Sequence, residues 1–200
     1  MKRTSLTLLA VLGLGACLGP QSRTTDEATY WLQYSPSVKP LANRSAPSIL
    51  VSPVRAAPGL ESTRMAYQRE THRLDYYARN RWVDTPAAML QPLVVKALEA
   101  HGAFAAVVQG PAAVQAQRRL DLDLTQFVQD FSQTPSRMRV SLRAQLIEMT
   151  TQKVLATRVF ESQLATASED ARGGVDAANR ALDALLPPLA AWVADVNGTP

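Results

Sequence analysis

The stretch RLDLDLTQF, residues 119–127, alternates leucine with polar residues and decides how the fold is read. Its leucines stand at every second position, and Asp121, Asp123 and Thr125 stand between them. Because successive side chains of a strand point to opposite faces, the pattern predicts a β-strand with one dry and one wet face. Phe127 breaks the alternation, which indicates a β-bulge.

The two segments that follow have the same character. Residues 137–148 (RMRVSLRAQLIE) alternate again, and residues 153–163 (KVLATRVFESQ) follow a Thr-rich turn. Together with residues 119–127 they predict a three-stranded antiparallel meander with one wet face. In residues 137–148 the side chains predicted to face inward are Met138, Val140, Leu142, Ala144 and Leu146, and those predicted to face outward are Arg137, Arg139 and Arg143.

The end of the chain supplies an apolar partner for the dry face. Apolar residues recur there at alternating steps of three and four, which predicts one continuous helical stripe. The register continues across Pro187 and Pro188, so the helix is expected to kink there and resume. The predicted fold class is α+β: two layers, a mainly antiparallel sheet with a three-stranded C-terminal meander, and helices packed on one face. The stripe consists of Val175, Ala178, Leu182, Leu185, Leu189, Trp192 and Val196.

Shorter elements are expected before the meander. Thr85 and Pro86 form a helix start, Gly102 marks its end, and Pro92 is expected to bend or delay it. Pro53 indicates an edge strand or a strand end. The expected strands are residues 30–34 (followed by a loop to Ala46), 48–54 and 103–109, with a hairpin over residues 63–79.

The N-terminus has the layout of a secretory signal. Lys2 and Arg3 precede a short apolar run over residues 6–14, which is too short to span a membrane, and Cys17 follows small residues. The stretch LGAC resembles the bacterial lipobox, in which the cysteine carries acyl chains such as palmitate. The single cysteine, Cys17, is therefore the predicted lipidation site. An ordinary signal peptide with a stray cysteine is the alternative.

These features give a predicted domain organisation. Leu18 stands where inner-membrane retention patterns usually have Asp, so the resemblance favours a lipid anchor on the periplasmic face of the outer membrane. The predicted organisation is a lipoprotein signal peptide over residues 1–16, a lipidated flexible tether over 17–29, a single globular α+β domain over 30–196 and a disordered tail over 197–200.

Charge and composition narrow the classes of partner. The chain has 21 Lys and Arg against 17 Asp and Glu, and it lacks the basic stripe with interleaved aromatics that nucleic-acid binding requires. We expect no nucleic-acid partner. Anionic lipid headgroups and an acidic protein surface both remain open.

Catalytic signals are weak throughout the sequence. Asp121 and Asp123 could hold a cation or act as an acid–base pair, but such a pair is more often a solvated strand face. His72 and His101 have no second close ligand, and the glycines of residues 171–176 (ARGGVD) are only a weak anion signal. We therefore predict no catalytic, metal or cofactor-binding residue, and no enzyme.

The order of these parts resembles the ABC-type transport auxiliary lipoproteins, the PqiC-like group. The resemblance implies a lipoprotein that works with an MCE-domain protein and an inner-membrane ABC permease and ATPase in lipid transport, without catalysis. It covers residues 30–196. The segments that carry it are the lipobox, YWLQYSP (30–36), ILVSPVRAAPGLESTRMAYQ (49–68), RWVDTPAAMLQPLVVKAL (81–98), RLDLDLTQF (119–127) and the terminal AAWV (190–193).

The predicted function is therefore a non-enzymatic outer-membrane subunit that docks the MCE-domain partner and supports envelope integrity. The alternatives are a lipid carrier, which would need an apolar pocket between sheet and helices, and a periplasmic hydrolase, and a homo-oligomer is possible. Exposed Arg and Tyr residues are the types that carry interface energy. The candidate partner interface comprises Arg73, Tyr76, Tyr77, Arg79, Arg81, Arg137, Arg139 and Arg143.

Overall fold

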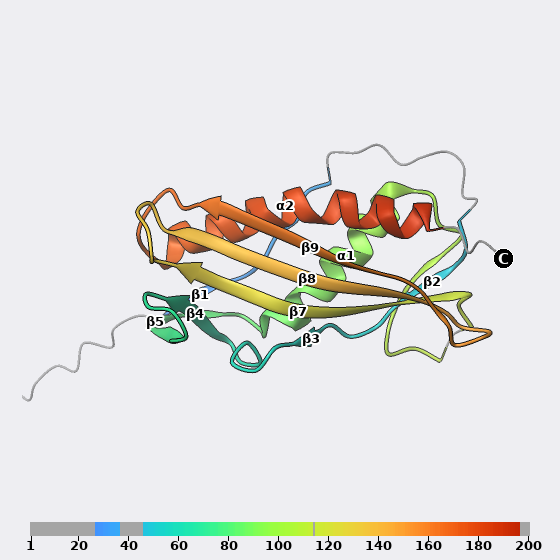
Figure 1. The fold of residues 1–200 in the computed structure, drawn as a ribbon, viewed down its shortest axis with the longest axis horizontal. Helices are drawn as coiled ribbons and strands as arrows, with labels where there is room; N and C mark the ends of the chain where they lie inside the picture. The colour runs from blue at the N-terminus through green and yellow to red at the C-terminus, as the bar shows by residue number, and fades with distance from the viewer. Residues whose placement is uncertain (1–26, 37–45, 114, 197–200) are drawn as a thin grey trace, which may run out of the picture.

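Strand β7 (Arg118–Asp130) is the centre of a mixed nine-stranded sheet in the computed structural model, which describes residues 27–36, 46–113 and 115–196. One edge of β7 pairs antiparallel with β8 (Arg137–Glu148), which pairs antiparallel with β9 (Val154–Ala165). Figure 1 shows these three long strands side by side. The predicted meander is therefore confirmed, and so is the α+β class.

The other edge of β7 is shared by three short strands that pair with it in parallel. They follow one another along β7 as β2 (Ile49–Val51), β3 (Arg55–Ala56) and β4 (Arg64–Gln68). The predicted hairpin is formed by β4 and β5 (Asp75–Trp82). The sheet is completed by β1 (Ala28–Tyr30), parallel to β5, and β6 (Val107–Gln109), parallel to β2.

The predicted bulge and the two faces of the meander are confirmed. The pairing of β7 with β8 shifts between Leu124 and Gln126, and this returns Phe127 to the buried face. All the side chains that were predicted to face inward are buried. They are Leu120, Leu122 and Leu124 on β7, and Met138, Val140, Leu142, Ala144 and Leu146 on β8.

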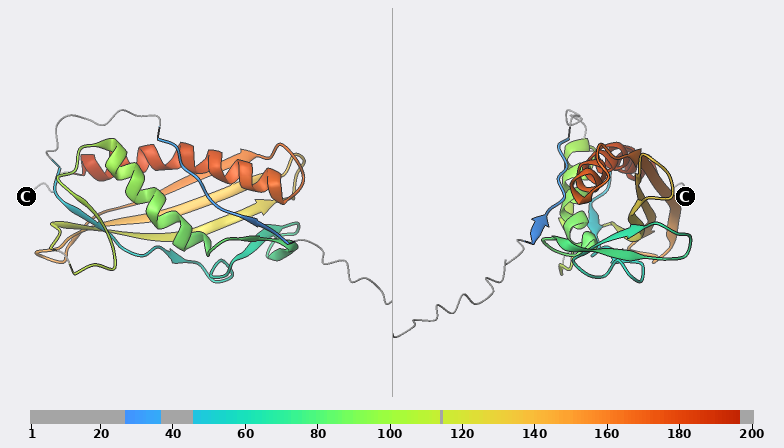
Figure 2. Two further views of the ribbon diagram at one scale, coloured as in Figure 1. Left: turned by 180° about the vertical axis from the view of Figure 1, so that it is seen from behind. Right: turned by 90° about the vertical axis from the view of Figure 1, so that its left-hand side faces the viewer.

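Helix α2 (Ala171–Asp195) lies against the inner face of β8 and β9. It includes Pro187 and Pro188, so the predicted continuation of the helix past the prolines is confirmed, while the kink stays a prediction. Its buried surface is wider than that stripe, because α1 (Pro86–His101) packs on its other side. Figure 2 shows the sheet curving around α2, with α1 closing the remaining side.

The ends of α1 agree with their sequence signals. The Thr85 hydroxyl accepts a hydrogen bond from the Ala88 N–H, and Gly102 takes the left-handed conformation at φ 75°. Without a Cβ, glycine adopts that conformation at little cost. Pro92 does not delay the helix, which begins at Pro86.

The strand expected over residues 30–34 is wrong in its placement. The strand β1 ends at Tyr30, and the chain then crosses the helices without joining the sheet. Leu32 and Tyr34 are still buried at alternate positions, while the Gln33 N–H donates to Asn179 Oδ1 at 2.9 Å. The alternation is therefore real, but these side chains pack on helices.

The sheet is mixed, with short parallel ladders beside long antiparallel ones, so that most of its paired residues are antiparallel as predicted. One boundary differs from its prediction. Ala28 and Thr29, which were placed in the tether, belong to β1.

Several predicted segments lie wholly or mostly outside the described residues. They are the signal, the tether, the tail and the loop before Ala46. Neither helix in the described ranges is long and apolar enough to cross a membrane.

Candidate functional site

The uncovered face of the meander carries the predicted row of arginines, and two of them form ion pairs with acids of β7. Arg139 Nη1 lies 3.3 Å from Asp130 Oδ2, and Arg143 Nη1 lies 3.3 Å from Asp123 Oδ2. Arg137 differs, because its Nε is buried and has no hydrogen-bond partner in the part of the chain that the structure describes. Arg139 and Arg143 are thus paired with acids of the neighbouring strand.

The carboxylates of β7 are held in their charged form by their neighbours. Asp123 Oδ1 accepts a hydrogen bond from Arg55 Nε at 2.7 Å, and this contact, more than any other, lowers the pKa of Asp123. Burial raises the pKa of Asp130, but hydrogen bonds from Ser132 and Arg139 outweigh burial, so that the net shift is downward. An acid with a lowered pKa is a poor general acid at neutral pH.

Asp121 is engaged in the same way as Asp123. It accepts from Ser52 Oγ at 2.6 Å and from Arg119 Nε at 3.0 Å. Across the described ranges, no group of three His, Cys, Asp or Glu side chains is placed to hold a metal ion. The contacts of Asp121 and Asp123 therefore fit strand-to-strand stabilisation.

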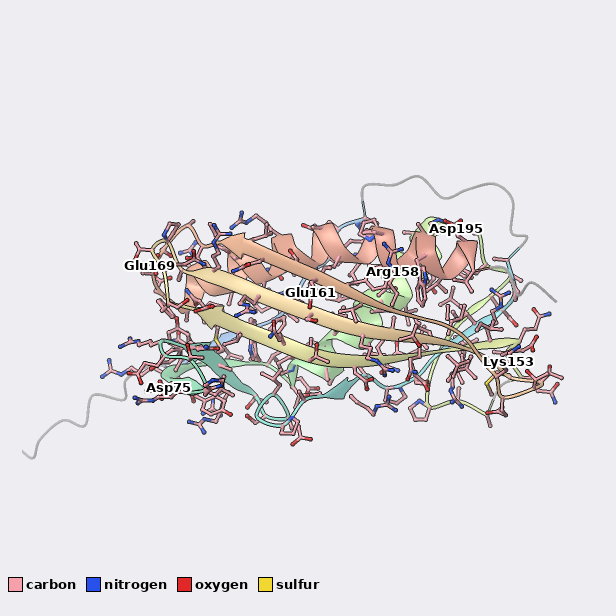
Figure 3. The ribbon with its side chains drawn as sticks, in the orientation of Figure 1. Asp75, Lys153, Arg158, Glu161, Glu169 and Asp195 are labelled. Carbon is pink, nitrogen blue, oxygen red and sulfur yellow. The ribbon has the colours of Figure 1, made fainter. Side chains whose placement is uncertain are left out.

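The bulge of β7 lies beside a polar hollow on the uncovered face. The hollow has a volume of about 250 Å³, and Glu161 in its wall accepts a hydrogen bond from Ser141 Oγ at 3.1 Å. Val159, two residues before Glu161 on β9, is 51% exposed. Figure 3 shows Glu161 on the side of the meander away from the helices. The lining residues are Gln126, Arg139, Val140, Glu161, Ser162 and Gln163.

Sequence reasoning missed this hollow. Two signals for it were present: the break in alternation at Phe127, and an apolar Val159 on the wet side of β9. Neither signal says that the bulge and the residues of β9 meet on one face. That depends on the pairing of β8 with both neighbours.

The other half of the candidate interface lies on β5 and in the turn before it, apart from the arginines of β8. Strands β4 and β7 stand between β5 and β8 in the sheet. The hydroxyl of Tyr76 donates to the Gly59 carbonyl, and that of Tyr77 to Gln129 Oε1, each at 2.9 Å. The two tyrosines are therefore tied to the protein itself.

The arginines of this half differ in their partners. Arg73 pairs with Glu70 and Asp75, and Arg81 pairs with Glu27. Arg79 is exposed and forms no ion pair with any acid among the described residues. The structure thus divides the predicted interface into two separate groups.

A buried polar network lies where α2 begins. Gln129 Nε2 donates to Ser136 Oγ at 2.9 Å, and Ser136 Oγ lies 2.7 Å from Thr166 Oγ1. The Ser136 N–H donates to Glu169 Oε1 at 2.8 Å. Burial raises the pKa of Tyr77, whose hydroxyl also bonds to Gln129. The network joins two turns to the sheet, and sequence reasoning did not detect it.

The glycines of residues 171–176 serve this packing. A Cβ added to Gly174 would lie 2.3 Å from Gln129 Oε1, so only glycine fits there without movement. The Asp170 carboxylate accepts from the Gly173 N–H at 2.8 Å and caps the helix. This hydrogen bond is the main cause of the lowered pKa of Asp170. A protein carboxylate therefore already occupies the position where the weak anion signal placed a ligand.

The two histidines lie on different elements. His72 is an exposed residue of the turn between β4 and β5, and His101 ends α1. His101 lines an apolar pocket of about 340 Å³ between α1, α2 and Tyr34, where its buried Nδ1 has no partner among the described residues. Pro187 and Pro188 form part of the opposite wall. Cys17, the predicted lipidation site, is outside the described residues.

Comparison with known proteins gives one family and several similar folds. A crystal structure of a protein from Xanthomonas campestris is 24% identical, with a TM-score of 0.75 over 84% of this chain and 96% of that chain. An uncharacterised protein is 15% identical, with a TM-score of 0.63 over 84% of this chain and 97% of that chain. At these identities the likeness shows the fold alone. Among curated proteins, none matches the chain.

The family match covers most of the domain. Residues 30–190 match the family described as the ABC-type transport auxiliary lipoprotein component, as the resemblance predicted. The family is not a known enzyme family. Because its members are lipoproteins of transport systems, membership implies that this protein associates with an ABC transport system and is located in the cell envelope. The chain belongs to the family of ABC-type transport auxiliary lipoprotein components.

Proposed function

We propose that this protein is a non-enzymatic docking subunit of an ABC lipid-transport system. It is anchored through acylated Cys17 to the periplasmic face of the outer membrane and binds an MCE-domain partner. That partner links it to the ABC permease and ATPase of the inner membrane. Membership of the transport auxiliary family supports the proposal, and so does the lipobox.

The polar hollow on the uncovered face of the meander is the observation that carries the proposal. Arg139, Glu161 and two glutamines line it, and the exposed apolar side chain of Val159 lies next to this lining, two residues before Glu161 on β9. Protein interfaces have this composition, with an apolar contact beside hydrogen-bonding groups that select the partner. We place the docking surface here, around the β8 half of the sequence-predicted interface.

The contacts of the acids favour docking over hydrolysis. A hydrolase needs polar groups with perturbed pKa values that converge on a cleft. Asp121, Asp123 and Asp130 instead each pair with arginines along the sheet, and the two pKa shifts resolved among them are downward. Such acids stabilise the strands that present the hollow.

A pair of valine substitutions on one strand tests the docking surface. Val159→Asp places a charge beside the hollow, whereas Val154→Asp places the same charge at a 47% exposed site about 17 Å along β9. Because an unpaired charge buried at an interface costs several kcal/mol, Val159→Asp should lower recovery of the MCE-domain partner at least tenfold. Recovery is measured by crosslinking in intact envelopes, purifying the lipoprotein and quantifying the partner by mass spectrometry.

Val154→Asp is the matched control and should leave recovery unchanged. Equal recovery with both variants, at equal protein level, would remove the hollow as the docking surface. Loss of self-association in Val159→Asp, with the partner retained, would assign the same face to a homo-oligomer.

Lipid carriage is a second candidate, because the apolar pocket beside His101 and Pro188 has a suitable lining. It lies between helices, and not between sheet and helices as a carrier was expected to require. Ala191→Trp would fill it. If the pocket carries lipid, this variant should abolish binding of a fluorescent fatty acid that the unchanged chain binds. An unchanged chain that binds no fatty acid would rule carriage out.

A further inference from the structure

A second surface, at the end of the domain where the tether arrives, combines exposed apolar and basic side chains. Strands β1 and β5 pair in parallel with Tyr30 opposite Trp82, and the Val83 N–H donates to the Tyr30 carbonyl at 2.7 Å. Continuing this register places Trp31 opposite Val83. They are 58% and 59% exposed, the highest values among the large apolar residues of the described chain.

Basic residues flank this apolar pair. Arg81 lies on β5, opposite Arg64 of β4 and two residues before Val83, which follows the end of the strand. The side chains of Arg64 and Arg81 therefore share the outer face with Trp31. Arg79 lies two residues earlier. Arg64 and Arg79 form no ion pair with any acid of the described residues, while Arg81 pairs with Glu27. We call Trp31, Val83, Arg64, Arg79 and Arg81 the tether-side patch.

We infer that the tether-side patch rests on the anionic lipid surface to which the chain is anchored. Tryptophan is enriched at the boundary between headgroups and acyl chains, and arginines near a membrane are attracted by anionic lipids. The patch therefore has the two components of a peripheral membrane contact. This assigns to lipid two arginines, Arg79 and Arg81, that the sequence grouped with the partner interface.

The length of the tether supports this occupant. Cys17 and Glu27 are ten residues apart, which is at most about 35 Å at full extension. Glu27 directly precedes β1, which lies at the edge of the sheet beside β5 (Figure 1). The inference rests on the proposed anchor in this step only, because a lipidated Cys17 holds this end of the domain near the bilayer.

The patch also differs in place from the docking surface. The hollow lies across β7, β8 and β9, and β4 separates β7 from β5 in the sheet. One protein can therefore contact the membrane through β1 and β5 while β8 and β9 face the periplasm. The two contacts are independent and can be removed separately.

Vesicle binding by the unacylated chain tests the inference without using the anchor. The protein is residues 17–200 with Cys17→Ser, and the probes are vesicles of phosphatidylcholine alone and of equimolar phosphatidylcholine and phosphatidylglycerol. We expect sedimentation with the anionic vesicles only, weakened by salt. Arg79→Gln should lower the affinity about fivefold. The matched control, Lys153→Gln, removes a charge at the opposite end of the meander (Figure 3) and should have little effect.

Tryptophan fluorescence shows whether the patch itself meets the lipid. Brominated acyl chains should quench Trp31 but neither the buried Trp82 nor the half-buried Trp192 of α2, so Trp31→Phe should remove the quenching. Val83→Ser should weaken binding, whereas Val154→Ser, at a 47% exposed site on β9, should not. The inference would be overturned if Arg79→Gln and Lys153→Gln lost vesicle binding equally, or if Val83→Ser and its valine control did. Equal binding to anionic and neutral vesicles would also overturn it.

The outcomes separate this inference from the proposed function. Vesicle binding through Trp31 without fatty-acid labelling of Cys17 would refute the anchor and keep the membrane contact. Labelling of Cys17 without vesicle binding would refute the contact and keep the anchor. A change in oligomeric state caused by Trp31→Ser in the absence of lipid would assign the patch to a second copy of the chain and overturn the inference.

Discussion

Gly174→Ala should destabilise the protein although alanine normally stabilises a helix. In a helix interior, alanine is favoured over glycine by about 1 kcal/mol. Here the new Cβ would lie 2.3 Å from Gln129 Oε1 and 3.1 Å from its Cδ. The Gln129 amide is buried and bonded to Tyr77 and Ser136, so it cannot move without losing these contacts.

The size of the effect follows from these bonds. Two hydrogen bonds contribute about 1 kcal/mol each, and stranding a buried partner costs about 1 to 3 kcal/mol more. The loss of about 3 to 5 kcal/mol exceeds the gain from alanine of about 1 kcal/mol, so Gly174→Ala should lower the free energy of unfolding by about 2 to 4 kcal/mol. Urea denaturation of the unacylated chain, followed by tryptophan fluorescence, measures it.

A double-mutant cycle provides the control. In a Gln129→Ala background the obstructing amide is gone, so Gly174→Ala should stabilise by up to about 1 kcal/mol and the sign should reverse. Stabilisation by Gly174→Ala in the unchanged protein would show that Gln129 yields freely. The explanation of this glycine by close packing would then be refuted.

Three other outcomes are expected. Metabolic labelling with a fatty acid should mark the unchanged protein and not Cys17→Ala; label retained by the variant would refute acylation at that residue. Leu122→Asp buries an unpaired charge and should lower the free energy of unfolding, measured by urea denaturation, by more than about 3 kcal/mol. Thr157→Asp, on the wet face, should change it by less than about 0.5 kcal/mol. Similar losses in the two variants would mean that the faces of the meander are assigned wrongly. The pKa of Asp170 is lower in the folded protein than in the unfolded chain, so the ionised carboxylate stabilises the fold above the unfolded pKa near 3.9, and this stabilisation is lost as the pH falls through the folded pKa. Asp170→Ser should therefore reduce the fall in the free energy of unfolding between about pH 5 and pH 2. An unchanged pH profile would contradict this.

The sequence alone determined the features that depend on neighbours along the chain. The period of two in residues 119–127 placed the leucines of β7 on the buried face and located the bulge. Thr85 and Gly102 marked the ends of α1, and the apolar stripe carried α2 through its two prolines. These signals are local, because side-chain alternation and helix capping involve residues a few positions apart.

Family membership was also accessible from the sequence. The lipobox and the order of the segments suggested the family of transport auxiliary lipoproteins, and the family match over residues 30–190 confirms that assignment. The candidate interface was less accessible. Its arginines and tyrosines were chosen by type, which says nothing of the partners that Tyr76, Tyr77 and Arg73 find within the chain.

Only the tertiary structure decided how distant segments meet. Strands β2 and β3 have three and two residues, which is too short for any period, and their pairing with β7 depends on the whole sheet. Leu32 and Tyr34 alternate like strand residues yet pack on helices, because burial produces the same pattern against either surface. Trp31 and Val83 are 52 residues apart in the sequence, and only the register of β1 on β5 places them on one exposed surface.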